Sequence, residues 1–314
     1  MKISFITTVF NEEKTIERFF DSLFAQTQLP DEIIIVDGGS SDATVSLIET
    51  QQSRNSHKSL PIKLFIKKGN RSVGRNEAIN HARGKIIVCS DSGNILDPNW
   101  IKHITAPFAD PSVAVVAGYY KGLAQTVFQK CLIPYTLVMP DKVNPQTFLP
   151  ATRSIAFRKS IWEKVGKFDE QYSHNEDYVF AKKLKKSGAK ITFIQDAIVY
   201  WIPRDNFQQA FVMFSRFAYG DAQSLIIRSK VIILFARYII AFILLLLAVF
   251  LKSSLLFFLL SFLGVTYILW SILKNYRYVT DLRAIFLLPL LQLCADAAVI
   301  FGTVLGLFKH FFKS

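Results

Sequence analysis

The chain has 314 residues, is 51% hydrophobic and carries a formal net charge of +13. This length allows one large domain and a further segment, and three scattered cysteines exclude a disulfide framework and a cysteine metal cluster, as in a reducing compartment. The positive charge suits anionic lipid headgroups better than nucleic acid, because no zinc-finger spacing or recognition-helix pattern accompanies it.

Short apolar runs separated by helical patterns make up the first part of the chain. Runs at 3–9, 33–36 and 86–89 each end in polar residues, and a fourth run covers 62–66. Strands that alternate with helices form a mostly parallel sheet with right-handed crossovers. We therefore predict an α/β domain in which the three runs with polar ends are neighbouring strands. The intervening helices are predicted at 16–24, 43–51 and 72–82.

The polar residues that follow these strands are expected to meet at one edge of the sheet. Asn11 and Glu12 follow the first strand, Asp37 follows the second and Asp91 follows the strand at 86–89. Open α/β sheets bind ligands at the carboxyl ends of their strands. Acidic and amide groups gathered there can hold a nucleotide and a divalent cation, so this edge is predicted to be a nucleotide-sugar site.

Beyond Asp97 the periodicity weakens. A helix is predicted at 98–108 and a strand at 113–118, whereas 119–150 is rich in aromatic residues and proline and has little pattern. A helix is expected again at 178–187. Two late strands are predicted at 190–194 and 197–201.

Long apolar segments follow Lys230. They cover 231–251, 255–273 and 284–308, and each is long enough to cross a bilayer. Arg237 in the first can extend its charge to the headgroups. Asp296 in the third is costly in lipid, which leaves open a re-entrant third segment.

These segments define the expected domain organisation: a catalytic domain at 1–204, an amphipathic helix at 205–230 and a membrane domain at 231–314. The aromatic stripe of the helix fits a membrane surface or core packing equally well. Lysine and arginine residues between the second and third segments indicate a cytoplasmic loop, so the first segment would leave the cytoplasm, the second return and the third leave again. The N-terminal run has no cleavage site, so the catalytic domain is expected on the cytoplasmic side of the cell membrane.

The motifs in this order resemble the nucleotide-binding half of inverting family-two glycosyltransferases, which have the GT-A fold. Residues 3–13 are similar to the first strand and Asn-Glu turn of that family, and 35–42 to its nucleoside-binding motif. Residues 74–79 resemble its Ala-Arg-Asn helix near the diphosphate. Glu176-Asp177 resembles the pair whose aspartate is the base. The likeness covers about residues 1–225.

The resemblance implies donor-binding roles for residues in these motifs. Asp37 can accept hydrogen bonds from uracil or ribose, although an ordinary Asp-Gly turn explains it as well. Arg75 offers a planar fork for phosphate oxygens, although a surface ion pair is the alternative. Arg153 lies in the stretch that separates donor and acceptor sites in the family. The implied donor-binding residues are Thr8, Phe10, Glu12, Asp37, Arg75, Asp91 and Arg153.

The resemblance assigns catalysis to Asp177, with Glu176 as the next candidate. Inversion needs one carboxylate to take the proton of the acceptor hydroxyl while the oxygen attacks the anomeric carbon. An acidic pair at the start of a helix is also a common N-terminal feature without catalytic meaning.

Asp91 is the expected ligand of Mg²⁺ or Mn²⁺, which would bridge its carboxylate to the donor diphosphate. The family usually has Asp-x-Asp here, whereas this chain has Asp91-Ser92-Gly93, so the second carboxylate is missing. A late histidine that often completes the site is also missing near 199–201. Asn94 or water is left to compensate.

These features predict a membrane-anchored glycosyltransferase of cell envelope glycan biosynthesis. It would use a nucleotide-sugar, preferably a UDP-sugar, and a lipid-linked glycan or polyprenyl phosphate as acceptor. A partial Gln-x-x-Arg-Trp motif at 213–217 argues against a synthase that threads a long polymer. A sugar nucleotidyltransferase is an alternative that the acidic loop at 10–13 disfavours. A non-catalytic nucleotide-binding membrane scaffold is another, which Asp177 disfavours.

Overall fold

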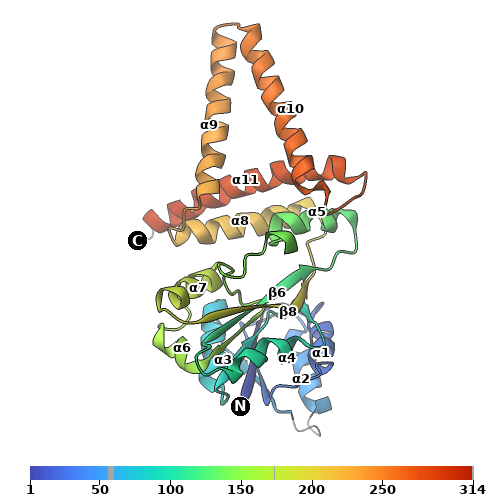
Figure 1. Ribbon diagram of the computed structural model, residues 1–314, viewed down its shortest axis with the longest axis vertical. Helices are drawn as coiled ribbons and strands as arrows, with labels where there is room; N and C mark the ends of the chain where they lie inside the picture. The colour runs from blue at the N-terminus through green and yellow to red at the C-terminus, as the bar shows by residue number, and fades with distance from the viewer. Residues whose placement is uncertain (56–59, 173, 313–314) are drawn as a thin grey trace. The chain divides into compact units, whose positions relative to one another are not determined.

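The computed structural model describes residues 1–55, 60–172 and 174–312 and divides into two compact units (Figure 1). The first unit is Met1–Leu123 with Val138–Ile202, and the second is Ala124–Leu137 with Pro203–Ser314. The predicted organisation divided the chain into 1–204, 205–230 and 231–314. In the structure the segment 124–137 leaves the first unit, because its helix packs with the helices of the second.

The first unit is built on one sheet of eight strands in the order β3-β2-β1-β4-β7-β6-β8-β5. β1 lies between β2 and β4, and both pairings are parallel, which confirms the predicted arrangement of the three strands with polar ends. β7 is antiparallel to both β4 and β6. The strands are β1 (Ile3–Val9), β2 (Glu32–Asp37), β3 (Ile62–Ile66), β4 (Ile86–Cys89), β5 (Asn94–Leu96), β6 (Val115–Gly122), β7 (Ile155–Arg158) and β8 (Ile191–Trp201).

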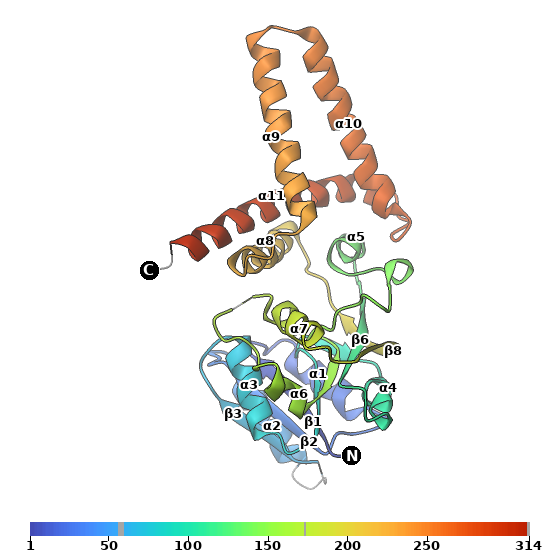
Figure 2. The ribbon, with the colours of Figure 1, turned by 60° about the vertical axis from the view of Figure 1, so that its left-hand side comes forward.

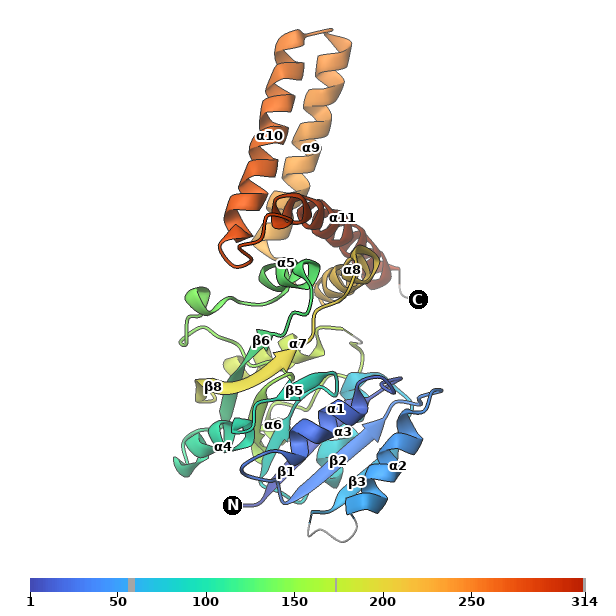
Figure 3. The ribbon, with the colours of Figure 1, turned by 90° about the vertical axis from the view of Figure 1, so that its right-hand side faces the viewer.

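Helices cover both faces of this sheet, which explains why its central strands are apolar on both sides. Figure 2 shows α3, α6 and α7 on one face, and Figure 3 shows α1 and α2 on the other. Along β1, Phe5 belongs to the core under α1 and α2, and the next residue, Ile6, to the core under α3. The helices are α1 (Ile16–Phe24), α2 (Thr44–Asn55), α3 (Arg71–His81), α4 (Trp100–Thr105), α6 (Lys159–Lys164) and α7 (Glu176–Lys186).

The middle of the chain differs most from the predicted elements. The two late strands form one strand, β8, whose pairing with β6 shifts register between Gly118 and Tyr119. β5 and β7 have three and four residues, which is too short for a recognisable pattern. The predicted helix at 98–108 is α4 continued by a short 3-10 turn, Ala106–Ala109. Pro134 interrupts the sequence signal of a further helix, α5 (Val127–Thr136).

The second unit consists of α5 and four longer helices. α9 and α10 form an antiparallel hairpin, and α8 and α11 lie side by side (Figures 1 and 3). Three helices, α9, α10 and α11, are long and apolar enough to cross a membrane. Tyr135 of α5 donates to the carbonyl of Leu288 on α11 (2.8 Å), which holds α5 in this unit. The longer helices are α8 (Phe207–Gln223), α9 (Ser229–Phe250), α10 (Ser254–Tyr276) and α11 (Ala284–Phe311).

A polar cluster within the second unit offsets the predicted cost of Asp296. Its carboxylate accepts hydrogen bonds from Arg237 (2.8 Å) and Tyr238 (2.9 Å) of α9. It also accepts from Tyr267 of α10 and from Gln292 of α11 (2.9 Å). Asp296 therefore ties three helices together instead of facing lipid unpaired.

Glycine makes the contact between α11 and α8 possible, and its replacement should separate the two helices. A Cβ on Gly302 would lie 2.2 Å from the carbonyl oxygen of Ser215, whereas a Cβ on Gly264 of α10 meets nothing within 4 Å. Gly302→Leu should therefore destabilise the protein by about 1–3 kcal/mol through overpacking. Thermal unfolding in detergent measures the effect, with Gly264→Leu as the matched control. Equal unfolding temperatures for both variants would contradict this packing.

Candidate active site

The centre of the candidate site is a buried arginine. Arg75 of α3 donates from Nη1 to Glu176 Oε1 (2.6 Å) and from Nη2 to Asp91 Oδ1 (3.0 Å). Its side chain is 2% exposed, so it is not a surface ion pair. An added Cβ at Gly74 would lie 2.7 Å from Thr8 Cγ2, and this close approach lets α3 pack against β1. One cation thus ties α3 to the loop after β4 and to the first turn of α7.

Asp177 is the carboxylate of the adjacent pair that stays partly exposed. The side chain of Glu176 is 4% exposed and is occupied by Arg75. Burial and the negative charge of Glu176 raise the pKa of Asp177. Asp91 raises it further, and the positive charges of Arg75 and Arg153 oppose the rise. A carboxylate with a raised pKa is a better proton acceptor, so Asp177 combines an open position with the proton affinity of a general base.

Asp91 stays ionised beside it. Burial alone would raise the pKa of Asp91, but the positive charges of Arg75, Arg71 and Arg153 outweigh burial and lower that pKa. The side chain is 40% exposed, although Arg75 occupies its Oδ1. An exposed, ionised carboxylate at the end of a central strand is suited to bind a cation.

The residues around Asp91 fit a metal ion that takes most of its ligands from water and substrate phosphates. Within 1–55, 60–172 and 174–312, no group of three or more His, Cys, Asp or Glu could hold a metal. Asn94 is buried, and its Nδ2 donates to Ser90 Oγ (3.3 Å). Mg²⁺ in phosphate sites commonly has one or two carboxylate ligands together with water and substrate phosphates. The single carboxylate of Asp91 is therefore enough protein ligand for such a metal ion.

Arg153 lies in the segment before β7, and its positive charge acts on the carboxylates of Asp91 and Asp177. Its guanidinium lies 5.7 Å from the ring centroid of Tyr120 on β6 and 5.3 Å from that of Trp201 on β8. Among the described residues it forms no ion pair within 4.0 Å. A planar cation held between two rings is free to bind phosphate oxygens in a forked geometry.

Asp37 ends β2 and holds the turn that follows it. Its Oδ1 accepts from the backbone N–H groups of Gly39 and Ser40 (both 2.8 Å), and its Oδ2 accepts from Ser40 Oγ (2.5 Å). Gly39 has φ +99°, a conformation that favours glycine. The side chain of Asp37 thus serves the turn that the sequence also allowed, and the residue is only 1% exposed.

The turn after β1 is hydrogen-bonded to the turn after β2. Asn11 donates from its backbone to Ser40 Oγ (2.8 Å), and Glu12 donates from its backbone to Thr44 Oγ1 (2.7 Å). Thr15 donates to the carboxylate of Glu12. Phe10 stays exposed, and a Cβ on Gly38 would lie 3.6 Å from its ring. Among the donor-binding residues expected on these turns, Phe10 thus offers an exposed apolar surface.

Three residues of the site were not predicted. Arg71 lies one turn before Arg75 on α3, so helical spacing offered a signal for it. Tyr120 and Trp201 hold Arg153, but they are brought together by the pairing of β6 with β8. No local pattern in the sequence announces that pairing.

The missing second carboxylate can be restored at Gly93. A Cβ there meets nothing within 4 Å, so an aspartate fits without a clash. Gly93→Asp should bind Mn²⁺ about tenfold more tightly in the presence of UDP, which corresponds to about 1.4 kcal/mol. Calorimetry measures the affinity, and Gly93→Asn controls for size without charge. Equal Mn²⁺ affinity in both variants would argue against a cation at Asp91.

Comparison with known families points to one class of enzyme. The family described as Glycosyl transferase family 2 matches residues 4–166, and Glycosyl transferase family group 2 matches residues 86–276. The O-antigen chain rhamnosyltransferase RfbN of Salmonella typhimurium is 24% identical over 237 residues, which cover 67% of this chain and 71% of that protein. The poly(ribitol-phosphate) beta-glucosyltransferase of Bacillus spizizenii is 25% identical over 236 residues, or 67% of this chain and 36% of that one.

A solved structure supports the fold. The mannosyltransferase PcManGT from Pyrobaculum calidifontis, in complex with GDP-Man and Mn²⁺, superposes with a TM-score of 0.70. The sequence identity is 18%, and the match covers 100% of this chain and 88% of that one. At this identity the likeness shows a shared fold.

Proposed function

The chain belongs to glycosyltransferase family 2, and from that premise we propose that it is an inverting enzyme that transfers one sugar from a nucleotide donor to an acceptor at the membrane surface. One observation carries the proposal: two adjacent carboxylates have different surroundings. Arg75 holds Glu176, whereas Asp177 is partly exposed and has a raised pKa. This difference favours Asp177 as the base and a positioning role for Glu176.

In the proposed reaction Asp177 accepts the proton of the acceptor hydroxyl as its oxygen attacks the anomeric carbon. The new C–O bond forms on the face opposite the departing nucleotide diphosphate, so the configuration inverts. Arg153 and Arg71 are placed to offset the negative charge that develops on the diphosphate. A divalent cation bound at Asp91 would supply further charge neutralisation.

A UDP-sugar is the preferred donor in this proposal. The turn occupies Asp37 Oδ1 twice and Oδ2 once, which leaves Asp37 about one remaining acceptor position. Uracil presents one N–H donor on its pairing edge, whereas guanine presents two adjacent donors that match a free carboxylate. Phe10, Thr8 and Glu12 complete the proposed donor-binding edge.

The acceptor is proposed to be a lipid-linked glycan or polyprenyl phosphate at the cell membrane. The relatives' names, an O-antigen chain rhamnosyltransferase and a poly(ribitol-phosphate) beta-glucosyltransferase, favour a cell envelope glycan. We propose that α9 and α10 insert in the membrane with lipids as partners. Lys274, Arg277 and Arg283 favour a cytoplasmic location for the segment that links α10 to α11, and hence for the catalytic unit.

Activity of the full-length protein in detergent tests this function. The protein is incubated with a panel of nucleotide-sugars, Mg²⁺ or Mn²⁺ and a lipid extract of its host membrane. We expect one nucleotide-sugar to be consumed and its sugar to appear in the lipid fraction with inverted configuration. Binding of UDP-sugars without transfer would favour the scaffold. Formation of a nucleotide-sugar from a sugar phosphate would favour the nucleotidyltransferase.

A further inference from the structure

The third apolar helix runs along α8 in a constant register. Cys294 Sγ lies 3.7 Å from the carbonyl oxygen of Phe207, and His310 Nδ1 lies 3.0 Å from that of Gln223. Between these ends, Gly302 and Gly306 of α11 lie against the backbone of Ser215 and Tyr219. Each pair is separated by the same interval along the sequence, so the two helices are parallel and in contact over the whole length of α8.

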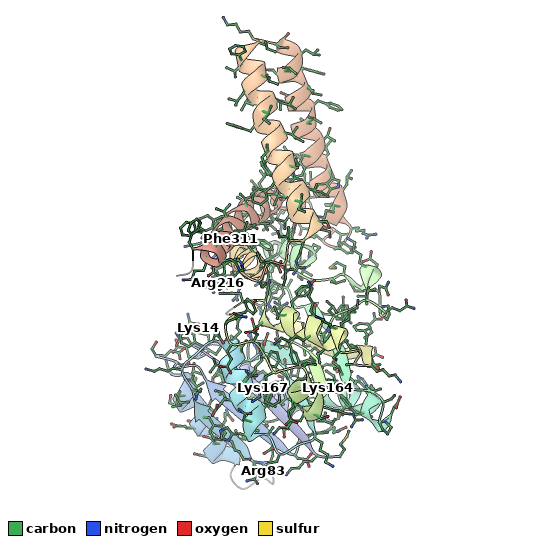
Figure 4. The ribbon with its side chains drawn as sticks, turned by 90° about the vertical axis from the view of Figure 1, so that its left-hand side faces the viewer. Lys14, Arg83, Lys164, Lys167, Arg216 and Phe311 are labelled. Carbon is green, nitrogen blue, oxygen red and sulfur yellow. The ribbon has the colours of Figure 1, made fainter. Side chains whose placement is uncertain are left out.

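This contact conflicts with a membrane crossing by α11. α8 carries Gln208, Gln209 and Arg216 on its exposed side. If α11 spanned the bilayer, α8 would lie beside it in the hydrocarbon, where an arginine and two amides are costly. At the membrane surface the same side chains remain hydrated. Figure 4 shows Arg216 on the side of the helix pair away from the α9–α10 hairpin and Phe311 nearer to it.

The polar cluster fixes how deep α11 lies relative to α9. A helix needs about 20 residues to cross a hydrocarbon core about 30 Å thick. If α9 leaves the core at Phe250, its last 20 residues begin at Val231, which marks the inner limit of the core. Arg237, the partner of Asp296, lies about 9 Å inside that limit. Interfacial helices bury their apolar faces about 5–10 Å into the boundary between headgroups and acyl chains. α11 therefore meets α9 at the depth of an interfacial helix.

The surface of α11 suits that boundary. Phe286, Phe301 and Phe308 are exposed along its length, and Lys309 stands at its end. A groove of about 480 Å³ lies where α11 meets α9, and Tyr238, Ala297, Ile300, Phe301 and Val304 give it a mostly apolar lining. Such a groove can take an acyl chain, while Arg216 and Lys309 are available to anionic headgroups.

We propose that α8 and α11 form a platform that lies flat in the cytoplasmic headgroup region of an anionic membrane, and that of α9, α10 and α11 only the first two cross. The end of α11 at Phe311 then lies on the same side as the segment 277–283, not on the opposite side as three crossings would require. The proposal rests on the proposed insertion of the α9–α10 hairpin. It does not depend on sugar transfer.

Cysteine labelling of the full chain in intact cells tests the topology. Cysteines replace Lys252 in the hairpin turn, Leu282 before α11 and Lys309 at its end, and the unaltered chain shows the background from its own cysteines. With a membrane-impermeant maleimide, we expect Lys252→Cys to react from outside, and Leu282→Cys and Lys309→Cys to react only after permeabilisation. Labelling of Lys309→Cys from outside would overturn the platform. No external labelling of Lys252→Cys would instead overturn the inserted hairpin on which it rests.

Depth measurement in vesicles provides the second readout. Nitroxides are attached to cysteines that replace Phe286, Phe301 and Phe308, in full-length protein reconstituted with phosphatidylcholine and phosphatidylglycerol. A platform predicts similar shallow depths at all three positions. A spanning helix would place Phe301 far deeper than Phe286, and that result would refute the proposal.

Discussion

Asp177→Asn is expected to slow sugar transfer at least about a hundredfold while nucleotide-sugar affinity stays within about twofold of the unaltered protein, because a general base typically contributes about 10² to 10⁴ in rate. Asparagine keeps the size of the side chain and removes its ability to accept a proton. Steady-state turnover and calorimetric donor binding measure the two quantities separately. A loss in turnover alone is characteristic of an interaction made only in the transition state.

The pH profile of the unaltered enzyme should carry the same signature. As the proposed base, Asp177 would act in its ionised form, and burial beside Glu176 raises its pKa. The acidic limb of kcat/KM should therefore lie above the range of an ordinary aspartate, with activity falling as pH drops through the raised pKa. In the folded protein the raised pKa disfavours the charged form at neutral pH. Asp177→Asn should consequently unfold at an equal or higher temperature, which separates its catalytic effect from misfolding.

Glu176→Gln is the comparison that discriminates between the two carboxylates. Its side chain can still contact Arg75, and it lies beside the proposed base without being exposed. We expect a smaller loss of turnover than in Asp177→Asn. Unchanged transfer by Asp177→Asn together with inactive Glu176→Gln would move the base to Glu176.

Arg75→Ala is expected to have the largest effect on stability, about 3–5 kcal/mol, because it leaves Glu176 buried without its partner. The sequence motif alone predicts a weaker donor affinity with an intact fold. The structure changes that expectation, since Arg75 is itself buried and bridges Glu176 and Asp91. Thermal unfolding should report the loss of stability, and UDP affinity at a temperature where the variant is folded should report the effect on donor binding.

Two further variants test whether the unpaired charge of Glu176 causes the loss of stability in Arg75→Ala. Arg71→Ala removes an exposed positive charge one turn away on the same helix, so it should weaken diphosphate binding with little effect on unfolding. Adding Glu176→Gln to Arg75→Ala removes the uncompensated charge and should restore part of the lost stability. An unfolding temperature for Arg75→Ala equal to that of Arg71→Ala would contradict the buried bridge.

The sequence by itself determined those features that depend on local patterns. Alternating helices and apolar runs predicted β1, β2 and β4 as parallel neighbours, because a buried strand must be apolar on both faces. Continuous apolarity after Lys230 predicted helices long enough to cross a bilayer. Asp91 follows a strand, Arg75 lies within a helix and the Glu176-Asp177 pair begins a helix. Each was found because it belongs to a recognisable motif.

Tertiary structure alone decided which of these residues contact one another. Arg75 and Glu176 are 101 positions apart, and only the packing of α3 and α7 on one face of the sheet brings them within 2.6 Å. The same holds for Arg153 between Tyr120 and Trp201. The direction of α11 depends on glycine contacts with α8 and on the bond from Arg237 to Asp296. Hydropathy measures how apolar a helix is, but its orientation follows from the surface against which it packs.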